Sequence, residues 1–300
     1  MYLPRGRIDE RATQHKVTLN EGDQIVLNDD RPSGWQAGDR TALLIHGLTG
    51  AHTSPYMQRI ARKLNDRGVR TFRMDLRGCG AGIGLARMPY HSGRSEDAAA
   101  ALNKIAELCP NSPATLIGFS LGGNIALKLL GESAAELPAH LDRAVAVCPP
   151  VDLLACVKSL ARGVNRLYDR HFVEHLRLQV DQKRRFIPDA PQLDVRCKPR
   201  GVFDFDEMYT APVCGFGTAL NYYRLCSSAQ FVPEIRIPTL VLAAADDPLV
   251  PRQMFDDLRL SNEVTLNLAP SGGHLGFIGR QNGDPDRRWM DWRVVEWATM

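Results

Sequence analysis

The sequence lacks a long hydrophobic run and has almost no net charge. Its longest stretch without a charged residue, residues 108–127, contains two prolines and three glycines, so it is not a membrane-spanning helix. The 37 Lys and Arg residues are interleaved with 34 Asp and Glu residues, and the formal net charge is +3. A basic block that could attract a nucleic acid is absent. We therefore expect no integral membrane segment and no nucleic-acid partner.

Closely spaced cysteines are lacking as well. The seven Cys residues are odd in number and include no C-x-x-C pair, which argues against a disulfide framework and against a cysteine-rich metal site. The first residues, MYLPRGRIDERATQHK, carry charges where a secretory signal has an apolar core. We expect free thiols, no export signal and a cytoplasmic location.

The sequence does contain a regular alternation of strand patterns and helix patterns. Apolar runs such as TALLI and ATLIGF predict buried strands, and amphipathic stretches such as SPYMQRIARKLNDRG predict helices between them. Strands that are separated by helices form a mostly parallel sheet with helices on both faces. At 300 residues we predict one α/β unit with a mostly parallel sheet of about eight strands.

One long segment interrupts this alternation. Residues 153–232 show helix patterns but no clear strand pattern. Connections between neighbouring elements of a sheet are usually about 2 to 6 residues long, and much longer insertions are often functional lids. We predict that residues 1–152 and 233–300 form the core domain and that residues 153–232 form a helical cap.

One serine lies at the break between a strand pattern and a helix pattern. Gly118, Ser120 and Gly122 form G-x-S-x-G, after the apolar run ATLIGF and before LGGNIALKLL. In this context the motif is typical of a nucleophile elbow, a strained turn that lifts the serine hydroxyl out of the sheet. Gly118 and Gly122 leave room where side chains would collide, and Gly123 lets the next helix approach the sheet. We predict Ser120 as a nucleophile.

A serine nucleophile needs a histidine base and a carboxylate that orients the histidine. With this elbow, the acid follows a late strand and the histidine follows the last strand. The late run LVLAAADD ends at Asp246 and Asp247, and the next run leads to His274. We choose Asp247 because the turn DPLVP resembles the acid turn of such enzymes, and we interpret Asp246 as a turn residue. The predicted triad is Ser120, Asp247 and His274.

The negative charge that develops on a carbonyl oxygen needs two N–H donors. One donor is predicted to be the backbone amide of Leu121, directly after the serine. The other is predicted to be the amide of Leu48, because the strand TALLI breaks at His46 and Gly47.

These stretches resemble the α/β-hydrolase family and, within it, the YheT-like branch. That branch is related to eukaryotic abhydrolases with phospholipase or esterase activity and to fungal medium-chain ethyl ester synthases. The resemblance runs from about residue 40 to the end, and its matching stretches are HGLTG, RGCG, YHSGRSEDAAAAL, GFSLGGN, FDEMYTAPVCGF, YYRLCS, AADDPLVP and GGHLGFIG. The usual F-D-D of this branch appears here as Phe205-Asp206-Glu207. The resemblance implies the α/β-hydrolase fold, the same triad, ester hydrolysis, and neither a cofactor nor a metal.

The predicted function is hydrolysis of small-molecule carboxylic esters with short to medium acyl chains, lipid-like esters among them. Two alternatives stay open. An acyltransferase would pass the acyl group to an alcohol, as the fungal relatives suggest. A non-enzymatic binding scaffold would keep the fold, although such proteins normally show a lost triad member. The sequence does not indicate an oligomeric state.

A zinc peptidase is the remote alternative. His171, Glu174 and His175 match the H-x-x-E-H zinc motif. They lie in the expected cap, however, where a spacing of four residues predicts the buried stripe of a helix. The predicted stripe consists of Tyr168, Phe172, Leu176 and Val180.

The basic run of residues 183–185, KRR, follows in the same predicted helix. We interpret it as a solvent-exposed face, with contact to a membrane surface as a second interpretation.

Overall fold

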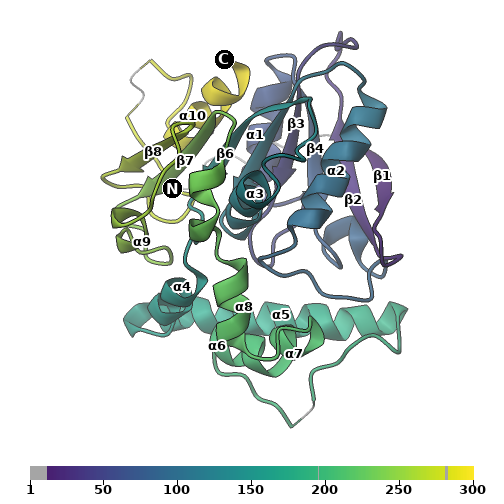
Figure 1. The fold of residues 1–300 in the computed structure, drawn as a ribbon, viewed down its shortest axis with the longest axis vertical. Helices are drawn as coiled ribbons and strands as arrows, with labels where there is room; N and C mark the ends of the chain where they lie inside the picture. Colours follow the sequence, from purple (N-terminus) through teal and green to yellow (C-terminus); the bar gives the residue numbers. More distant parts are fainter. Residues whose placement is uncertain (1–11, 195, 281–282) are drawn as a thin grey trace.

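The computed structural model describes residues 12–194, 196–280 and 283–300, which form a sheet with helices on both faces (Figure 1). Most of the N-terminal stretch in which we expect no export signal lies outside these residues. The strands are β1 (Thr13–Thr18), β2 (Gln24–Asp30), β3 (Thr41–Ile45), β4 (Arg70–Asp75), β5 (Ala114–Phe119), β6 (Leu141–Val147), β7 (Thr239–Ala244) and β8 (Val264–Ala269).

The strands form one eight-stranded sheet in the order β1-β2-β4-β3-β5-β6-β7-β8. The pairs β1/β2 and β2/β4 are antiparallel, and the five remaining pairs are parallel. The prediction of a mostly parallel sheet of about eight strands is confirmed.

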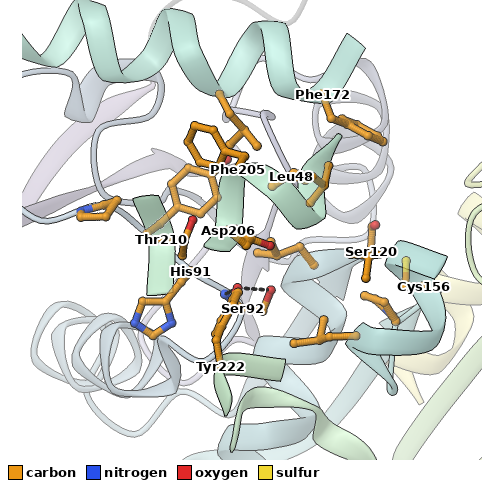
Figure 2. A pocket seen from close by; sticks show the side chains of 18 of the residues that line it. Leu48, His91, Ser92, Ser120, Cys156, Phe172, Phe205, Asp206, Thr210 and Tyr222 are labelled. Carbon is orange, nitrogen blue, oxygen red and sulfur yellow. Dashed lines mark hydrogen bonds between the residues drawn. The ribbon is translucent and has the colours of Figure 1, made fainter. Parts of the chain in front are cut away.

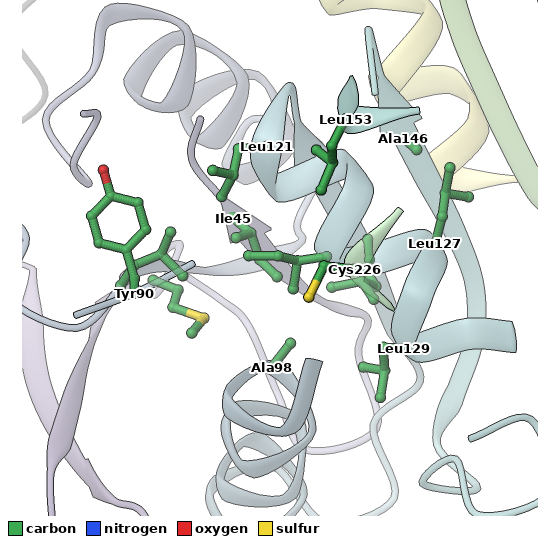
Figure 3. Packing of buried hydrophobic residues seen from close by; sticks show 14 of the residues in the cluster. Ile45, Tyr90, Ala98, Leu121, Leu127, Leu129, Ala146, Leu153 and Cys226 are labelled. Carbon is green, nitrogen blue, oxygen red and sulfur yellow. The ribbon is translucent and has the colours of Figure 1, made fainter. Parts of the chain in front are cut away.

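Each face of the sheet has its own hydrophobic cluster, because successive side chains of a strand point to opposite faces. In β3, Leu43 and Ile45 pack with α2 and α3, whereas Ala42 and Leu44 pack with α1 and α10. Figure 3 shows part of the first cluster, with Ile45 from β3 near Leu121 at the start of α3. The helices are α1 (Pro55–Asn65), α2 (Ser95–Leu108), α3 (Leu121–Glu132) and α10 (Trp289–Thr299).

Between β6 and β7 the chain forms a layer of helices at one end of the sheet (Figure 1). We call residues 153–232 the insertion; its role as a cap stays a prediction. Its helices are α4 (Leu153–Leu160), α5 (Arg166–Phe186), α6 (Val202–Phe205), a π-helix (Asp206–Thr210), α7 (Ala211–Val213) and α8 (Ala219–Cys226). The remaining short helices are α9 (Gln253–Asp256) and the 3₁₀ turns Gly80–Gly82, Gly163–Asn165, Ser228–Gln230 and Val232–Glu234. In the described part of the chain, each helix is too short or too polar to cross a membrane.

The buried face of α5 differs from the predicted stripe. Leu176 and Val180 are buried as predicted, but Tyr168 is 49% exposed and Val173 is buried instead. A strict four-residue repeat drifts around the helix by about 40° per step, because a turn contains 3.6 residues. The buried residues follow alternating steps of four and three, which keeps them on one face. They are Asp169, Val173, Leu176, Val180 and Lys183.

Candidate active site

Loops that follow four strands meet at one edge of the sheet. Leu48 follows β3, Ser120 follows β5, Asp247 follows β7 and His274 follows β8. These four strands are parallel, so their carboxyl ends lie at the same edge, where ligands bind in open α/β sheets. The predicted site residues therefore come together although they are far apart in sequence.

Ser120 occupies a strained turn between β5 and α3. Its φ is 51°, a backbone conformation that L side chains rarely adopt. A Cβ atom added at Gly118 would lie 2.2 Å from the carbonyl oxygen of Gly122, and one added at Gly122 would lie 2.4 Å from the carbonyl oxygen of Ile45. A Cβ at Gly123 would lie 3.1 Å from the Pro149 side chain. The glycines thus permit both the turn and the close approach of α3.

The side chains of Ser120, His274 and Asp247 form a chain of hydrogen bonds. Ser120 Oγ lies 3.0 Å from His274 Nε2, and His274 Nδ1 lies 2.8 Å from Asp247 Oδ2. Asp246 Oδ1 instead accepts hydrogen bonds from the amides of Gly272 and Gly273, at 2.7 and 2.8 Å. His274 therefore contacts Asp247 and not Asp246, which instead binds the loop that leads to His274.

Asp247 is held in its ionised form. Burial by itself raises the pKa of this carboxyl group, but the hydrogen bond and charge of His274 and the amides of Leu249 and Val250 together hold the pKa below its ordinary value. The two amides donate to Asp247 Oδ1 at 2.9 and 3.0 Å. An ionised Asp247 fixes the proton of His274 on Nδ1 and leaves Nε2 free to accept the serine proton.

Two tyrosine hydroxyls hold the turn that contains Leu48. The Gly47 amide donates to Tyr56 Oη at 2.9 Å, and the Thr49 amide donates to Tyr90 Oη at 3.0 Å. The Leu48 amide lies between them in sequence and has no acceptor among the described residues. This amide is therefore available to a ligand, as expected for an oxyanion donor.

The buried His46 ring also stabilises this turn through two hydrogen bonds. Its Nδ1 donates to the Gly47 carbonyl at 2.8 Å, and its Nε2 accepts from the Leu76 amide at 3.2 Å. Burial lowers the pKa of His46, so its ring is neutral, as this pair of bonds requires. The Leu121 amide, like that of Leu48, has no acceptor within the described part of the chain.

A pocket of about 1050 Å³, including its opening to solvent, lies between the sheet edge and the insertion. Ser120, His274, Leu48 and Leu121 all line it. In Figure 2, Ser120 and Phe172 lie toward one side of the pocket, and His91 lies toward the other. Aliphatic side chains from α4 and α5 form much of the wall. They are Leu153, Val157, Leu160, Leu176 and Val180.

Asn124 connects three parts of the site, and our sequence reasoning assigned it no role. Its side-chain amide donates to the carbonyl oxygens of Ser92 and Cys226 at 2.9 and 2.8 Å and accepts from the Ser228 amide at 2.9 Å. Tyr222 Oη also donates to Ser92 Oγ at 2.9 Å (Figure 2). The stretches YHSG, GFSLGGN and YYRLCS therefore meet in space. Their joint presence in the sequence was the signal that could have indicated a connecting role for Asn124.

The H-x-x-E-H residues do not gather around a metal position in the described structure. His171, Glu174 and His175 are exposed on α5. His175 Nδ1 donates to the His171 carbonyl at 2.8 Å, so this nitrogen is already occupied. The geometry gives the zinc peptidase alternative no support.

Among the described residues, a single group of three side chains could hold a metal ion, namely Cys148, Asp247 and His274. Asp247 and His274 are bonded to each other. Burial, reinforced by the charge of Asp247, raises the pKa of the Cys148 thiol well above its ordinary value, and a neutral thiol is a poor ligand. Asp247 and His274 thus contact each other, and Cys148 is a buried neutral thiol beside them.

A family model of the alpha/beta hydrolase fold matches residues 42–281. The chain belongs to this family. It is 32% identical over 289 residues to "Putative esterase YheT" of Escherichia coli (strain K12). This alignment covers 95% of this chain and 84% of that protein. It is 30% identical over 257 residues to the monoacylglycerol lipase of Saccharomyces cerevisiae (strain ATCC 204508 / S288c). This alignment covers 82% of this chain but only 56% of that protein.

A solved structure of Est1E from Butyrivibrio proteoclasticus with bound ferulic acid has the same fold. Its TM-score is 0.61 at 14% sequence identity, and the match covers 95% of this chain and 98% of that chain. The predicted α/β-hydrolase fold and the YheT-like relationship are confirmed. The chain is a hydrolase, and ester hydrolysis is the general activity that its relatives support.

Proposed function

We propose that this chain hydrolyses carboxylic esters through Ser120, His274 and Asp247, with an acyl-enzyme on Ser120. The observation that carries the proposal is the pair of hydrogen bonds, 3.0 and 2.8 Å, that joins these side chains at the strained turn. A buried acid, a histidine and a serine in this arrangement activate the hydroxyl as a nucleophile.

In the first step, Ser120 Oγ attacks the ester carbonyl carbon while His274 Nε2 takes the hydroxyl proton. Asp247 stabilises the imidazolium that forms and keeps its ring oriented. The amides of Leu48 and Leu121 donate to the oxyanion. His274 then gives the proton to the leaving alkoxide, and the alcohol departs from the acyl-enzyme.

In the second step, His274 takes a proton from a water molecule, whose oxygen attacks the acyl carbon. The same amides stabilise the second oxyanion, and the proton returns from His274 to Ser120 Oγ as the acid is released. An alcohol in place of water would give ester synthesis by the same route. The insertion acts as a cap, and its aliphatic wall favours short to medium acyl chains.

The proposal is tested by labelling the purified protein with a tagged fluorophosphonate and by measuring turnover of p-nitrophenyl esters of rising acyl length. We expect labelling and turnover in the wild type and in Ser133→Ala, a control serine at the end of α3. Ser120→Ala should lose both, with kcat reduced by several orders of magnitude. Turnover retained in pure Ser120→Ala would refute the nucleophile. Addition of ethanol distinguishes hydrolysis from acyl transfer, because only a transferase would form ethyl esters in quantity.

A further inference from the structure

The pocket wall contains a positive charge that the proposed mechanism does not use. Lys183 on α5 is only 6% exposed and lines the same pocket as Ser120. Our interpretation of residues 183–185 as an exposed face was wrong for this residue, because it belongs to the buried face of α5. Arg184 and Arg185 are exposed as expected.

Lys183 has unusually few partners for a buried ammonium group. Its Nζ donates to the Arg87 carbonyl oxygen at 3.3 Å, and no carboxylate of the described residues lies within ion-pair distance. An ammonium carries three N–H donors, so two of them have no acceptor among the described residues. Buried lysines are almost always paired with an acid. The donors of Lys183 are therefore available to a ligand in the pocket.

Arg77 also lines this pocket but, unlike Lys183, forms ion pairs with acidic side chains. Its guanidinium contacts Asp97 at 2.8 Å and Asp23 at 3.0 Å. Asp23 also accepts hydrogen bonds from the amides of Arg87 and Met88, at 2.6 and 3.0 Å. Asp23, whose negative charge acts on Lys183, is thus already bound to other donors and forms no ion pair with Lys183 in the described structure.

Lys183 remains charged at neutral pH. Burial lowers the pKa of Lys183 to about 8, and the negative charge of Asp23 opposes this decrease. The ammonium form therefore predominates at pH 7.

A series of hydrogen bonds leads from the turn that contains Leu48 to the helix that carries Lys183. The Thr49 amide donates to Tyr90 Oη at 3.0 Å, and Tyr90 Oη donates to Gln179 Oε1 at 3.3 Å. Gln179 and Lys183 are one helical turn apart on α5, so their Cβ atoms are about 6 Å from each other. Lys183 and Leu48 both line the pocket that contains Ser120. A substrate carbonyl at Ser120 and a second group at Lys183 can belong to one small molecule.

We propose that Lys183 forms an anion subsite and that this enzyme selects esters carrying a carboxylate or phosphate group remote from the scissile carbonyl. The inference rests on the proposed ester hydrolysis at Ser120 and adds a substrate class to it. An anion at Lys183 gains charge-assisted hydrogen bonds, which are stronger than neutral ones. A methyl group at the same place leaves a buried charge unpaired, which is unfavourable.

The test compares matched anionic and neutral substrates. On the acyl side, mono-p-nitrophenyl esters of succinate, adipate, suberate and sebacate are compared with methyl-terminated esters of the same chain length. On the alcohol side, 1-butyrylglycerol 3-phosphate is compared with 1-butyrylglycerol. We expect the wild type to prefer the anionic member of at least one arm by about tenfold in kcat/KM. The arm that responds identifies a carboxylate or a phosphate as the ligand.

Lys183→Met removes the charge and keeps an unbranched side chain that is shorter by one atom. Its anionic-to-neutral ratio of kcat/KM should fall to about one, and because the ratio is taken within one variant, a general loss of activity cancels. Lys183→Arg should retain part of the preference. Lys158→Met is the matched control, because Lys158 is exposed on α4, and its ratio should equal that of the wild type.

Equal rates for both members of both arms in the wild type would overturn the anion subsite, as would a preference that survives Lys183→Met. Neither result affects the proposed function, provided that Ser120 is labelled by the fluorophosphonate and that neutral esters are turned over. Failure of the proposed function would instead appear as absence of labelling in the wild type.

Discussion

Replacement of Asp206 by Asn should make the stability of this protein less dependent on pH. Asp206 begins the π-helix of the insertion, is 8% exposed and lines the pocket. Burial raises the pKa of Asp206 to about 6, while hydrogen bonds from Thr210 and Tyr223 act in the opposite direction. The Tyr223 hydroxyl donates to Asp206 Oδ2 at 2.7 Å, and no cation lies within ion-pair distance in the described residues.

The sign of the effect follows from the two pKa values. In the unfolded chain the pKa of this carboxyl group is near 3.8, so the folded state binds the proton more tightly. The contribution to stability is therefore complete below pH 3.8 and is lost as the pH rises through about 6. A shift of about two units corresponds to about 3 kcal/mol in total, of which about half is lost between pH 5 and pH 8.

Asp206→Asn removes the charge and keeps an oxygen that can accept the Tyr223 hydroxyl. The variant should be more stable than the wild type at pH 8 by up to about 3 kcal/mol, which is about 5 °C in melting temperature for a chain of this length. The advantage should shrink by about 1.5 kcal/mol at pH 5. Urea unfolding at both pH values measures this difference in the free energy of unfolding. Glu174→Gln is the control, because Glu174 is an exposed acid of α5. An equal difference between variant and wild type at the two pH values would refute the reasoning.

Two further substitutions test the support of the site. Tyr56→Phe leaves the Gly47 amide without its acceptor and loosens the turn beside Leu48, so kcat should fall about 2- to 10-fold with little change in KM; a rise in KM alone would contradict a positioning role. Gly118→Ala places a Cβ 2.2 Å from the Gly122 carbonyl oxygen and should lower the melting temperature sharply or prevent folding, whereas Gly82→Ala, whose Cβ would meet nothing closer than 3.6 Å, should fold. A Gly118→Ala protein as stable as Gly82→Ala would show that the elbow tolerates a side chain there.

The parts of the site that lie on the sheet could be predicted from the sequence because local patterns determine them. A strand, a tight turn and a helix in succession place Ser120 at the sheet edge whatever the rest of the chain does. The ends of β7 and β8 then place Asp247 and His274 at the same edge, since parallel strands end together. The choice of Asp247 over Asp246 came from the DPLVP turn, and it needed no knowledge of the insertion.

The insertion could not be predicted to the same detail, because its helices depend on tertiary contacts. The burial of Lys183 depends on the precise rotation of α5, and a small drift of the assumed repeat moved it to the wrong face. Charged residues are mostly exposed in folded proteins, so a hydrophobic pattern predicts them on the solvent side of a helix. The burial of Lys183 and Asp206 in the pocket wall was consequently not predicted.

These two charges differ in how far the protein itself satisfies them. Asp206 receives a hydrogen bond from Tyr223, whereas two N–H groups of Lys183 have no acceptor in the part of the chain that the structure describes. Removal of the Asp206 charge should therefore change stability, and removal of the Lys183 charge should change the choice of substrate. The two roles can be separated by measuring the anionic-to-neutral ratio of kcat/KM in Asp206→Asn. A ratio equal to that of the wild type would show that the charges act independently, whereas a raised ratio would mean that Asp206 repels the same anion that Lys183 attracts.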